Sequence, residues 1–169
     1  MTELKEIDYK ILFELMKNSK TSDRSLAKKI GVSQPTITRR RARLEKEVIE
    51  DYTTIPNWDK LGYQIFALTF VKIKMVIGTR EQYDKIRARA FKWLKNQPNI
   101  IMAGSCRGIG VDSFMISIHK TYAEYDDFLR RHRLEIGDLV EEVKPVIVNL
   151  AGQEVLKSLS LKYLADVSE

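Results

Sequence analysis

Apolar residues recur at helical spacing in the first fifty residues of the chain. The first stripe consists of Ile7, Ile11, Leu12, Leu15 and Met16. This spacing predicts a helix over about residues 7–17. Ser22 and Ser33 stand where helix N-caps are expected, and Gly31 stands where the helix between them should end. The pattern therefore predicts three short helices within residues 1–50.

The junction of the second and third helices has the spacing of a helix-turn-helix unit. Ala27 is small enough to let two helices cross closely, and Gly31 supplies the positive φ of a tight turn. The apolar residues that can fill the angle between the helices are Leu26, Ile30, Val32 and Ile37. In such units the second helix of the pair enters the major groove of DNA.

The outward side chains of the third predicted helix are of types that bind DNA. Gln pairs with adenine, Arg pairs with guanine, and Ser, Thr and Arg can also hold phosphates. The candidate DNA-binding residues are Ser33, Gln34, Thr36, Thr38, Arg39, Arg40 and Arg43. Arg41 instead falls on the inward seam with Ile37 and Leu44, where an unpaired guanidinium is costly. Its stem can lie along the core with its head outside, or it can pair with an acid such as Glu45.

Beyond a turn-rich stretch, the periodicity changes from helical to alternating. Residues 51–62 begin with strand-like side chains and predict a linker with a short strand. Four further strands are predicted over residues 64–76, 100–106, 113–118 and 143–150. Capping boxes that begin at Thr79 and Thr121 predict a helix after the first and the third of these strands. A short helix over about residues 155–164 is predicted to close the chain.

The order β-α-β-β-α-β is that of a ferredoxin-like domain. The predicted fold class is therefore α+β, with a helix-turn-helix domain over residues 1–50, a linker over 51–62 and a ferredoxin-like domain over 63–169. Apolar residues fall on both faces of the first strand, with Ile65 and Val71 on one and Phe66, Leu68 and Phe70 on the other. Because the two helices cover one face only, we expect a second copy of the chain to cover the other.

Charge is concentrated in the predicted helix-turn-helix. The chain carries 29 Lys and Arg against 23 Asp and Glu, a net charge of +6 over 169 residues. From Lys20 to Lys46, nine basic residues face only Asp23 and Glu45, so this window alone carries +7 and the rest of the chain −1. A solvated helix face is one reading of such a block, and an anionic partner such as duplex DNA is the other.

Composition excludes several classes of protein. No apolar run approaches the ~18 residues of a membrane span, and the acidic N-terminus is unlike a signal peptide. Cys106 is the one cysteine, which favours a reducing, cytoplasmic setting without disulfides. It stands thirteen residues before His119 with no second ligand nearby, so no metal site is expected. His132 lies on a helical stripe, where a histidine is more often a packed residue than a catalytic base. We therefore expect the protein to be neither an enzyme nor a cofactor-binding protein.

Several segments, in their order along the chain, resemble the Lrp/AsnC (leucine-responsive, or feast-famine) family of transcription regulators. They are residues 8–12 (Asp-Tyr-Lys-Ile-Leu), 25–33, Arg40, 43–45, 48–49 and 60–62. The resemblance implies a regulator that dimerises through its C-terminal sheets, often assembles into tetramers or octamers, and senses an amino acid at contacts between dimers. It places the recognition helix at residues 34–46, where Arg41 departs from the aliphatic residue usual in the family.

The resemblance also implies an effector site before the third strand of the second domain. The family often carries Gly-x-x-Asp there, and this chain has Arg-Gly-Ile-Gly-Val-Asp over residues 107–112. The candidate effector-binding residues are Gly108, Gly110 and Asp112. A hairpin turn is an equally good account of the same residues.

Two other functions fit parts of the pattern. RNA-recognition modules share the β-α-β-β-α-β order, but here Ile109 and Val111 replace two of the three aromatic residues on which bases stack. An architectural protein that coats DNA through its phosphates would need the same basic helices as a regulator. The sequence favours a sequence-specific, dimeric or larger DNA-binding regulator and leaves the architectural function open.

Overall fold

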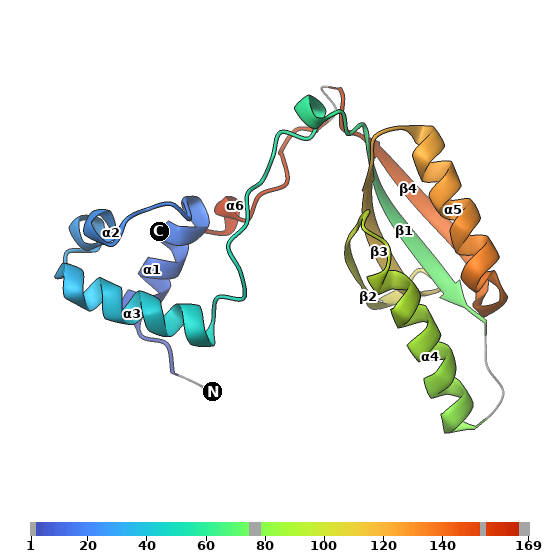
Figure 1. The fold of residues 1–169 in the computed structure, drawn as a ribbon, viewed down its shortest axis with the longest axis horizontal. Helices are drawn as coiled ribbons and strands as arrows, with labels where there is room; N and C mark the ends of the chain where they lie inside the picture. The colour runs from blue at the N-terminus through green and yellow to red at the C-terminus, as the bar shows by residue number, and fades with distance from the viewer. Residues whose placement is uncertain (1–2, 75–78, 153–154, 166–169) are drawn as a thin grey trace. The chain divides into compact units, whose positions relative to one another are not determined.

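The chain forms two compact units, each with its own hydrophobic core (Figure 1). The computed structural model describes residues 3–74, 79–152 and 155–165. Unit 1 consists of residues 1–55 together with 158–169, and unit 2 consists of residues 56–157. The sequence-based division put the whole C-terminal segment in the second domain, whereas its last residues here belong to the helical unit.

Unit 1 is helical. Its elements are α1 (Glu6–Lys17), α2 (Asp23–Ile30), α3 (Gln34–Glu47) and the short α6 (Lys162–Ala165), which packs against α1. The three N-terminal helices confirm the predicted ones. The core consists of Ile11, Leu15, Leu26, Ala27, Ile37 and Leu44.

Local signals set the ends of the unit 1 helices. The Ser22 and Ser33 hydroxyls accept the N–H groups of Ser25 and Thr36, which caps α2 and α3. Gly31 ends α2 with φ of 80°, a backbone conformation that glycine adopts without a Cβ clash. Its N–H donates to the Ala27 carbonyl, 3.0 Å away. The turn that sequence spacing predicts is therefore formed.

Unit 2 is a four-stranded antiparallel sheet with two long helices. Its elements are β1 (Ile65–Ile73), α4 (Arg80–Lys95), β2 (Ile100–Gly108), β3 (Val111–His119), α5 (Tyr122–Ile136) and β4 (Val140–Asn149), with single 3-10 turns at Asp59–Leu61 and Gly137–Leu139. The strand order is β2-β3-β1-β4. This arrangement confirms the predicted ferredoxin-like fold.

The two faces of the sheet have different surroundings. One face packs against α4 and α5, and its core includes Ala67, Val71, Met115, Trp93, Tyr125 and Phe128. No element among the described residues of unit 2 covers the other face. Down its middle, Leu68 of β1 is paired with Ile116 of β3 and with Val146 of β4, which is 51% exposed. We call this apolar surface the open sheet face.

Three predicted elements differ from the observed ones. No strand forms at residues 51–55, because a strand needs a hydrogen-bonded neighbour and none in the described chain pairs with this segment. The first strand of unit 2 ends at Ile73, and Met75 and Val76 of the prediction lie outside the described residues. The closing helix is confined to Lys162–Ala165. Across the described ranges, no helix is long and apolar enough to span a membrane.

Candidate nucleic-acid interface

The outer side of α3 presents a stripe of exposed residues. Its members lie in two neighbouring rows with steps of four residues, Gln34, Thr38, Ala42 and Lys46 in one and Pro35 and Arg39 in the other. The opposite side of the helix carries Ile37 and Leu44, both fully buried. Because the buried pair fixes which side of α3 faces inward, the exposed stripe is the side that is free to meet a partner.

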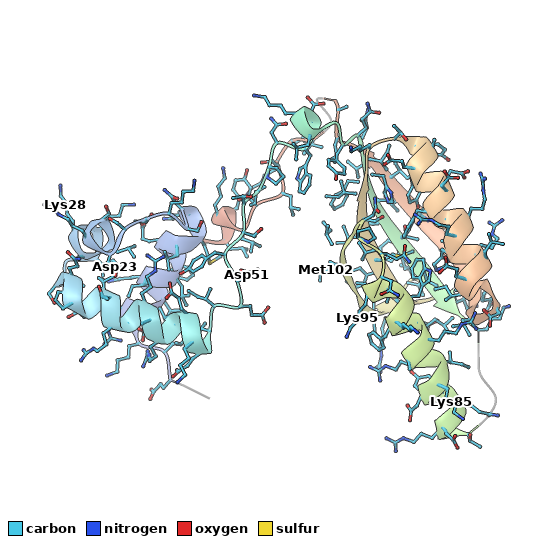
Figure 2. All side chains as sticks on the ribbon, in the orientation of Figure 1. Asp23, Lys28, Asp51, Lys85, Lys95 and Met102 are labelled. Atoms are coloured by element: carbon cyan, nitrogen blue, oxygen red, sulfur yellow. The ribbon has the colours of Figure 1, made fainter. Side chains whose placement is uncertain are left out.

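Four cations of α2 and α3 are not neutralised by an ion pair in the described chain. Arg39 and Lys46 on α3, and Arg24 and Lys28 on α2, are exposed and form no salt bridge with any residue in the described part of the chain. Figure 2 shows Lys28 pointing away from unit 1. Lys29 differs from them, because its ammonium pairs with Glu14 at 2.5 Å. These four cations leave α2 and α3 with positive charge that no ion pair in the described chain neutralises.

Arg40 and Arg43, two of the predicted DNA-binding residues, point inward to Asp8 of α1. Asp8 is fully buried, and its two carboxylate oxygens accept from Arg40 Nη1 at 2.9 Å and from Arg43 Nη2 at 2.7 Å. The Lys5 N–H donates to the same carboxylate at 2.9 Å. We call Asp8, Arg40 and Arg43 the Asp8 anchor, since it ties α3 to α1.

The surroundings of Asp8 keep it ionised. Burial by itself would raise the pKa of this carboxyl, but the hydrogen bonds from Lys5 and Arg40 and the charges of Arg40 and Arg43 outweigh it. The pKa of Asp8 therefore lies below its usual value. The sequence did not single out Asp8 for this role, although an acid on the inward side of a helix was a signal that a cation must accompany it.

Arg41 pairs with acids instead of leaving its head in solvent. Its Nε donates to Glu45 at 2.9 Å, the partner considered from sequence, and its Nη1 donates to Asp23 at 3.2 Å and to the Thr21 carbonyl at 3.1 Å. The guanidinium also lies over the Tyr52 ring. Arg41 thus connects α3 to the start of α2, and it is part of the scaffold of the unit.

The hydroxyl residues predicted to bind DNA make local hydrogen bonds. The Ser33 hydroxyl lies 2.8 Å from that of Thr36, and the Thr38 hydroxyl donates to Asp23 at 2.6 Å. Ser33 and Thr38 are nevertheless exposed, and Gln34 is exposed without any such bond. Of the seven predicted residues, Gln34 and Arg39 are the two whose side chains are both exposed and unbonded in the described structure.

Sequence comparisons match the helical unit and about three quarters of the chain. The AsnC-type helix-turn-helix domain matches residues 4–45. The HTH-type transcriptional regulator FL11 of Pyrococcus furiosus is 32% identical over 145 residues, which cover 72% of this chain and 95% of FL11. LrpC of Bacillus subtilis is 28% identical over 131 residues, or 76% of this chain and 83% of LrpC.

This chain belongs to the Lrp/AsnC family of transcriptional regulators. Some curated relatives match over a shorter region. An uncharacterised regulator of Pyrococcus furiosus, PF1734, is 38% identical over 86 residues, and the chain spans 53% of its length. The family assignment confirms the resemblance drawn from the ordered segments of the sequence.

Solved structures of the Lrp/AsnC family share the fold. The Neisseria meningitidis regulator NMB0573, solved with L-Met, matches with a TM-score of 0.78 at 17% identity over 94% of this chain and 96% of that protein. AsnC of E. coli matches with a TM-score of 0.67 at 20% identity, over 94% of this chain and 99% of AsnC. At these identities the likeness shows the fold.

The residues expected at the family's effector site lie in and beside the β2–β3 turn. Ile109 and Gly110 form its two central positions with φ of 45° and 73°, and Gly108 before them has φ of 125°. Positive φ at both central positions is the mark of a type I′ hairpin turn. Asp112 Oδ2 accepts the Ile73 N–H at 2.8 Å, so this carboxylate ties β3 to the end of β1.

The two histidines lie in the core of unit 2. His119 and His132 are 1% and 3% exposed, and burial lowers the pKa of each. His119 Nε2 lies 2.9 Å from the Ser117 hydroxyl, and the His132 ring packs edge-on against Trp93. Within the described ranges, no group of three or more His, Cys, Asp or Glu is placed to hold a metal ion.

Proposed function

We propose that this Lrp/AsnC-family chain regulates transcription by placing α3 in the major groove of duplex DNA. The exposed stripe of α3, together with four cations of α2 and α3 that pair with no acid in the described unit, carries the proposal. Recognition helices use their N-terminal residues on base edges and their flanking cations on phosphates. The helix-turn-helix matched over residues 4–45 supports the same conclusion.

The seven residues predicted from sequence divide into three roles. Gln34 and Arg39 are assigned to DNA, because their side chains are exposed and unbonded in the described structure. Thr38 can join them by giving up its bond to Asp23. Arg40 and Arg43 are assigned to positioning α3 through the Asp8 anchor. Ser33 and Thr36 form the N-terminal cap.

Self-association through the open sheet face is part of the proposal. A continuous apolar surface without a covering element is unusual for a protein that stays monomeric. Two chains paired by a two-fold axis would present two copies of α3 to one duplex. Such a dimer reads a pseudo-palindrome whose half-sites are separated by about one helical turn or a multiple of it.

We also propose that an amino acid modulates this regulator. This modulation is supported by the shared fold of the Neisseria meningitidis regulator that was solved with L-Met. We do not assign the effector to Gly108, Gly110 and Asp112, because the hairpin turn and the Asp112–Ile73 bond account for these residues. A rise in the melting temperature of the purified chain with one of the twenty amino acids would identify an effector.

Selection of bound fragments from a random duplex library, with single-stranded RNA as competitor, tests the DNA proposal. A palindromic consensus is the expected result. Tight duplex binding without a consensus would favour the architectural alternative, and complete displacement by RNA would refute α3 as a duplex-binding helix.

The variant Arg39→Ala then tests the contact itself. If Arg39 binds phosphate, the slope of log K against log salt becomes shallower by about 0.9 for each copy on the duplex. If it binds guanine, selectivity at one base pair relaxes by about 1–3 kcal/mol instead. Lys10→Ala is the matched control, because Lys10 is exposed on α1 and already pairs with Glu6 at 2.6 Å. Equal behaviour of the two variants would remove Arg39 from the interface.

A further inference from the structure

Positive charge in unit 2 is concentrated on one helix. Residues 56–157 contain sixteen Lys and Arg against twelve Asp and Glu, a net charge of +4. α4 alone holds six of the basic and two of the acidic residues, which is also +4. The remaining ten basic and ten acidic residues of the unit cancel. The net charge of unit 2 therefore equals the net charge of α4 alone.

Internal ion pairs neutralise two of the six basic residues of α4, and Arg80 at its start has no ion-pair partner in the described chain. Lys85 pairs with Glu81 at 2.7 Å, and Arg89 pairs with Asp138 at 2.7 Å. Arg87, Lys92 and Lys95 are exposed and pair with no acid in the part of the chain that the structure describes. Figure 2 shows Lys85 and Lys95 toward opposite ends of the helix.

Arg87, Lys92 and Lys95 lie on the side of α4 that faces away from the sheet. Trp93 is buried at 5% exposure and fixes the inward side, whereas Phe91, between Arg87 and Lys92, is 48% exposed. The Arg87 guanidinium lies over the Phe91 ring, 5.2 Å from its centre, which restricts the directions it can take. We call Arg87, Phe91, Lys92 and Lys95 the α4 basic face.

Helix stability explains only part of this charge. Lys92 and Lys95 lie in the last turn of α4, where cations interact favourably with the helix dipole. Arg87 lies two turns earlier and gains little from the dipole, because that effect falls off within the last turn. The excess of four charges in a unit that is otherwise neutral therefore calls for an anionic partner.

The chemistry of the α4 basic face fits a phosphate backbone better than an acidic protein. Lysine is depleted from the cores of protein interfaces, which use buried apolar anchors. The α4 basic face instead offers three cations and one half-exposed ring that already contacts Arg87. From residue 87 to residue 95 a helix rises about 12 Å. Over that length, one strand of duplex DNA carries three to four phosphates, spaced roughly 3.4 Å apart.

We propose that the α4 basic face is a second DNA-binding surface, which holds the phosphate backbone outside the segment read by α3. The proposal rests on duplex DNA being the ligand of the helix-turn-helix. It adds a sequence-independent contact made by unit 2, so that affinity depends on the length of the duplex as well as on its sequence.

The test compares the full-length chain with R87Q/K92Q/K95Q on two duplexes that share the selected consensus. The short duplex has about 21 base pairs, or two helical turns, and the long one about 63, or six turns. The control K72Q/K85Q/R130Q removes the same three charges from exposed pairs with Glu141, Glu81 and Asp126. Affinity is measured by fluorescence anisotropy at several salt concentrations, and the oligomeric state by light scattering.

On the long duplex, the α4 variant should make the slope of log K against log salt shallower than the control's by about 3 for each copy of the chain, with about 0.9 lost for each phosphate contact. On the short duplex, the two variants should bind alike. Equal slopes for the α4 variant and the control on both duplexes would overturn the proposal. A changed oligomeric state of the α4 variant with an unchanged slope would also overturn it, and would make the α4 basic face a protein contact. Failure of the wild-type chain to bind either duplex would instead refute the function proposed for α3.

Discussion

Asp8→Asn tests whether the Asp8 anchor positions the recognition helix. Asparagine keeps the shape of the side chain but removes the charge that two arginines share. Loss of one partner of a buried ion pair typically costs about 3–5 kcal/mol. The Asp8 side chain is fully buried, but those of Arg40 and Arg43 are 20% and 34% exposed, so water can partly replace the lost carboxylate. We therefore expect unit 1 to lose about 2–3 kcal/mol, at the lower end of that range or just below it.

A loss of this size is large for a helical unit of this length. For domains of 60–100 residues, 1 kcal/mol shifts the melting temperature by about 4–8 °C, so we expect a decrease of about 10–20 °C. Both tryptophans of the chain, Trp58 and Trp93, belong to unit 2. Their fluorescence therefore follows unit 2, whereas far-ultraviolet circular dichroism also follows the helices of unit 1. The expected result is a lower dichroism transition with an unchanged fluorescence transition.

Glu6→Gln is the matched control for the Asp8 variant. It removes one acidic charge from the same helix, but Glu6 is 83% exposed and pairs only with Lys10. Exposed pairs of this kind contribute little to stability. If Asp8→Asn and Glu6→Gln shift the dichroism transition equally, the Asp8 anchor does not hold α3, and Arg40 and Arg43 return to the set of candidate DNA contacts.

Two further predictions concern unit 2. Leu68→Lys places a charge in the middle of the open sheet face, once in each chain of a dimer. Because each buried leucine contributes about 1.5–3 kcal/mol, sedimentation should show a dimer dissociation constant raised at least ~100-fold, and an unchanged constant would exclude this face. His119 and His132 have lowered pKa values because they are buried, so the unfolded chain takes up protons first as pH falls below about 6.5. The fluorescence melting temperature should therefore fall from pH 7 toward pH 5, less steeply in His132→Gln, and a flat profile would contradict the assignment.

Much of the fold could be predicted because local and long-range signals agree. Ser33, Gly31 and the apolar positions Ile37 and Leu44 each specify the same helix-turn-helix geometry, and the structure forms it. The β-α-β-β-α-β order could be predicted from the alternation of apolar residues in the strands and from two capping boxes at the helix starts. The short strand expected at residues 51–55 does not form because strand propensity is local, whereas a strand exists only where a second strand pairs with it.

The candidate site was harder to predict than the fold, because the outward and inward cations of α3 look alike in sequence. Arg39, Arg40, Arg41 and Arg43 fall within five positions, and a rotation of about 100° per residue distributes them around the helix. Which of them remains free depends on Asp8, more than thirty residues earlier in the chain. No pattern within α3 itself contains that information.

The charge that matters for an anionic ligand is the charge that remains after internal pairing. Near α3 this remainder is Arg24, Lys28, Arg39 and Lys46, and on α4 it includes Arg87, Lys92 and Lys95. A cation that already donates a hydrogen bond to a carboxylate must break or share that bond to hold a phosphate. It therefore adds less to the affinity for DNA and to the salt dependence of binding. The total of nine basic residues between Lys20 and Lys46 therefore overstates the contribution of the helix-turn-helix. By the same reasoning, α4 contributes more than its place in a nearly neutral part of the sequence suggests.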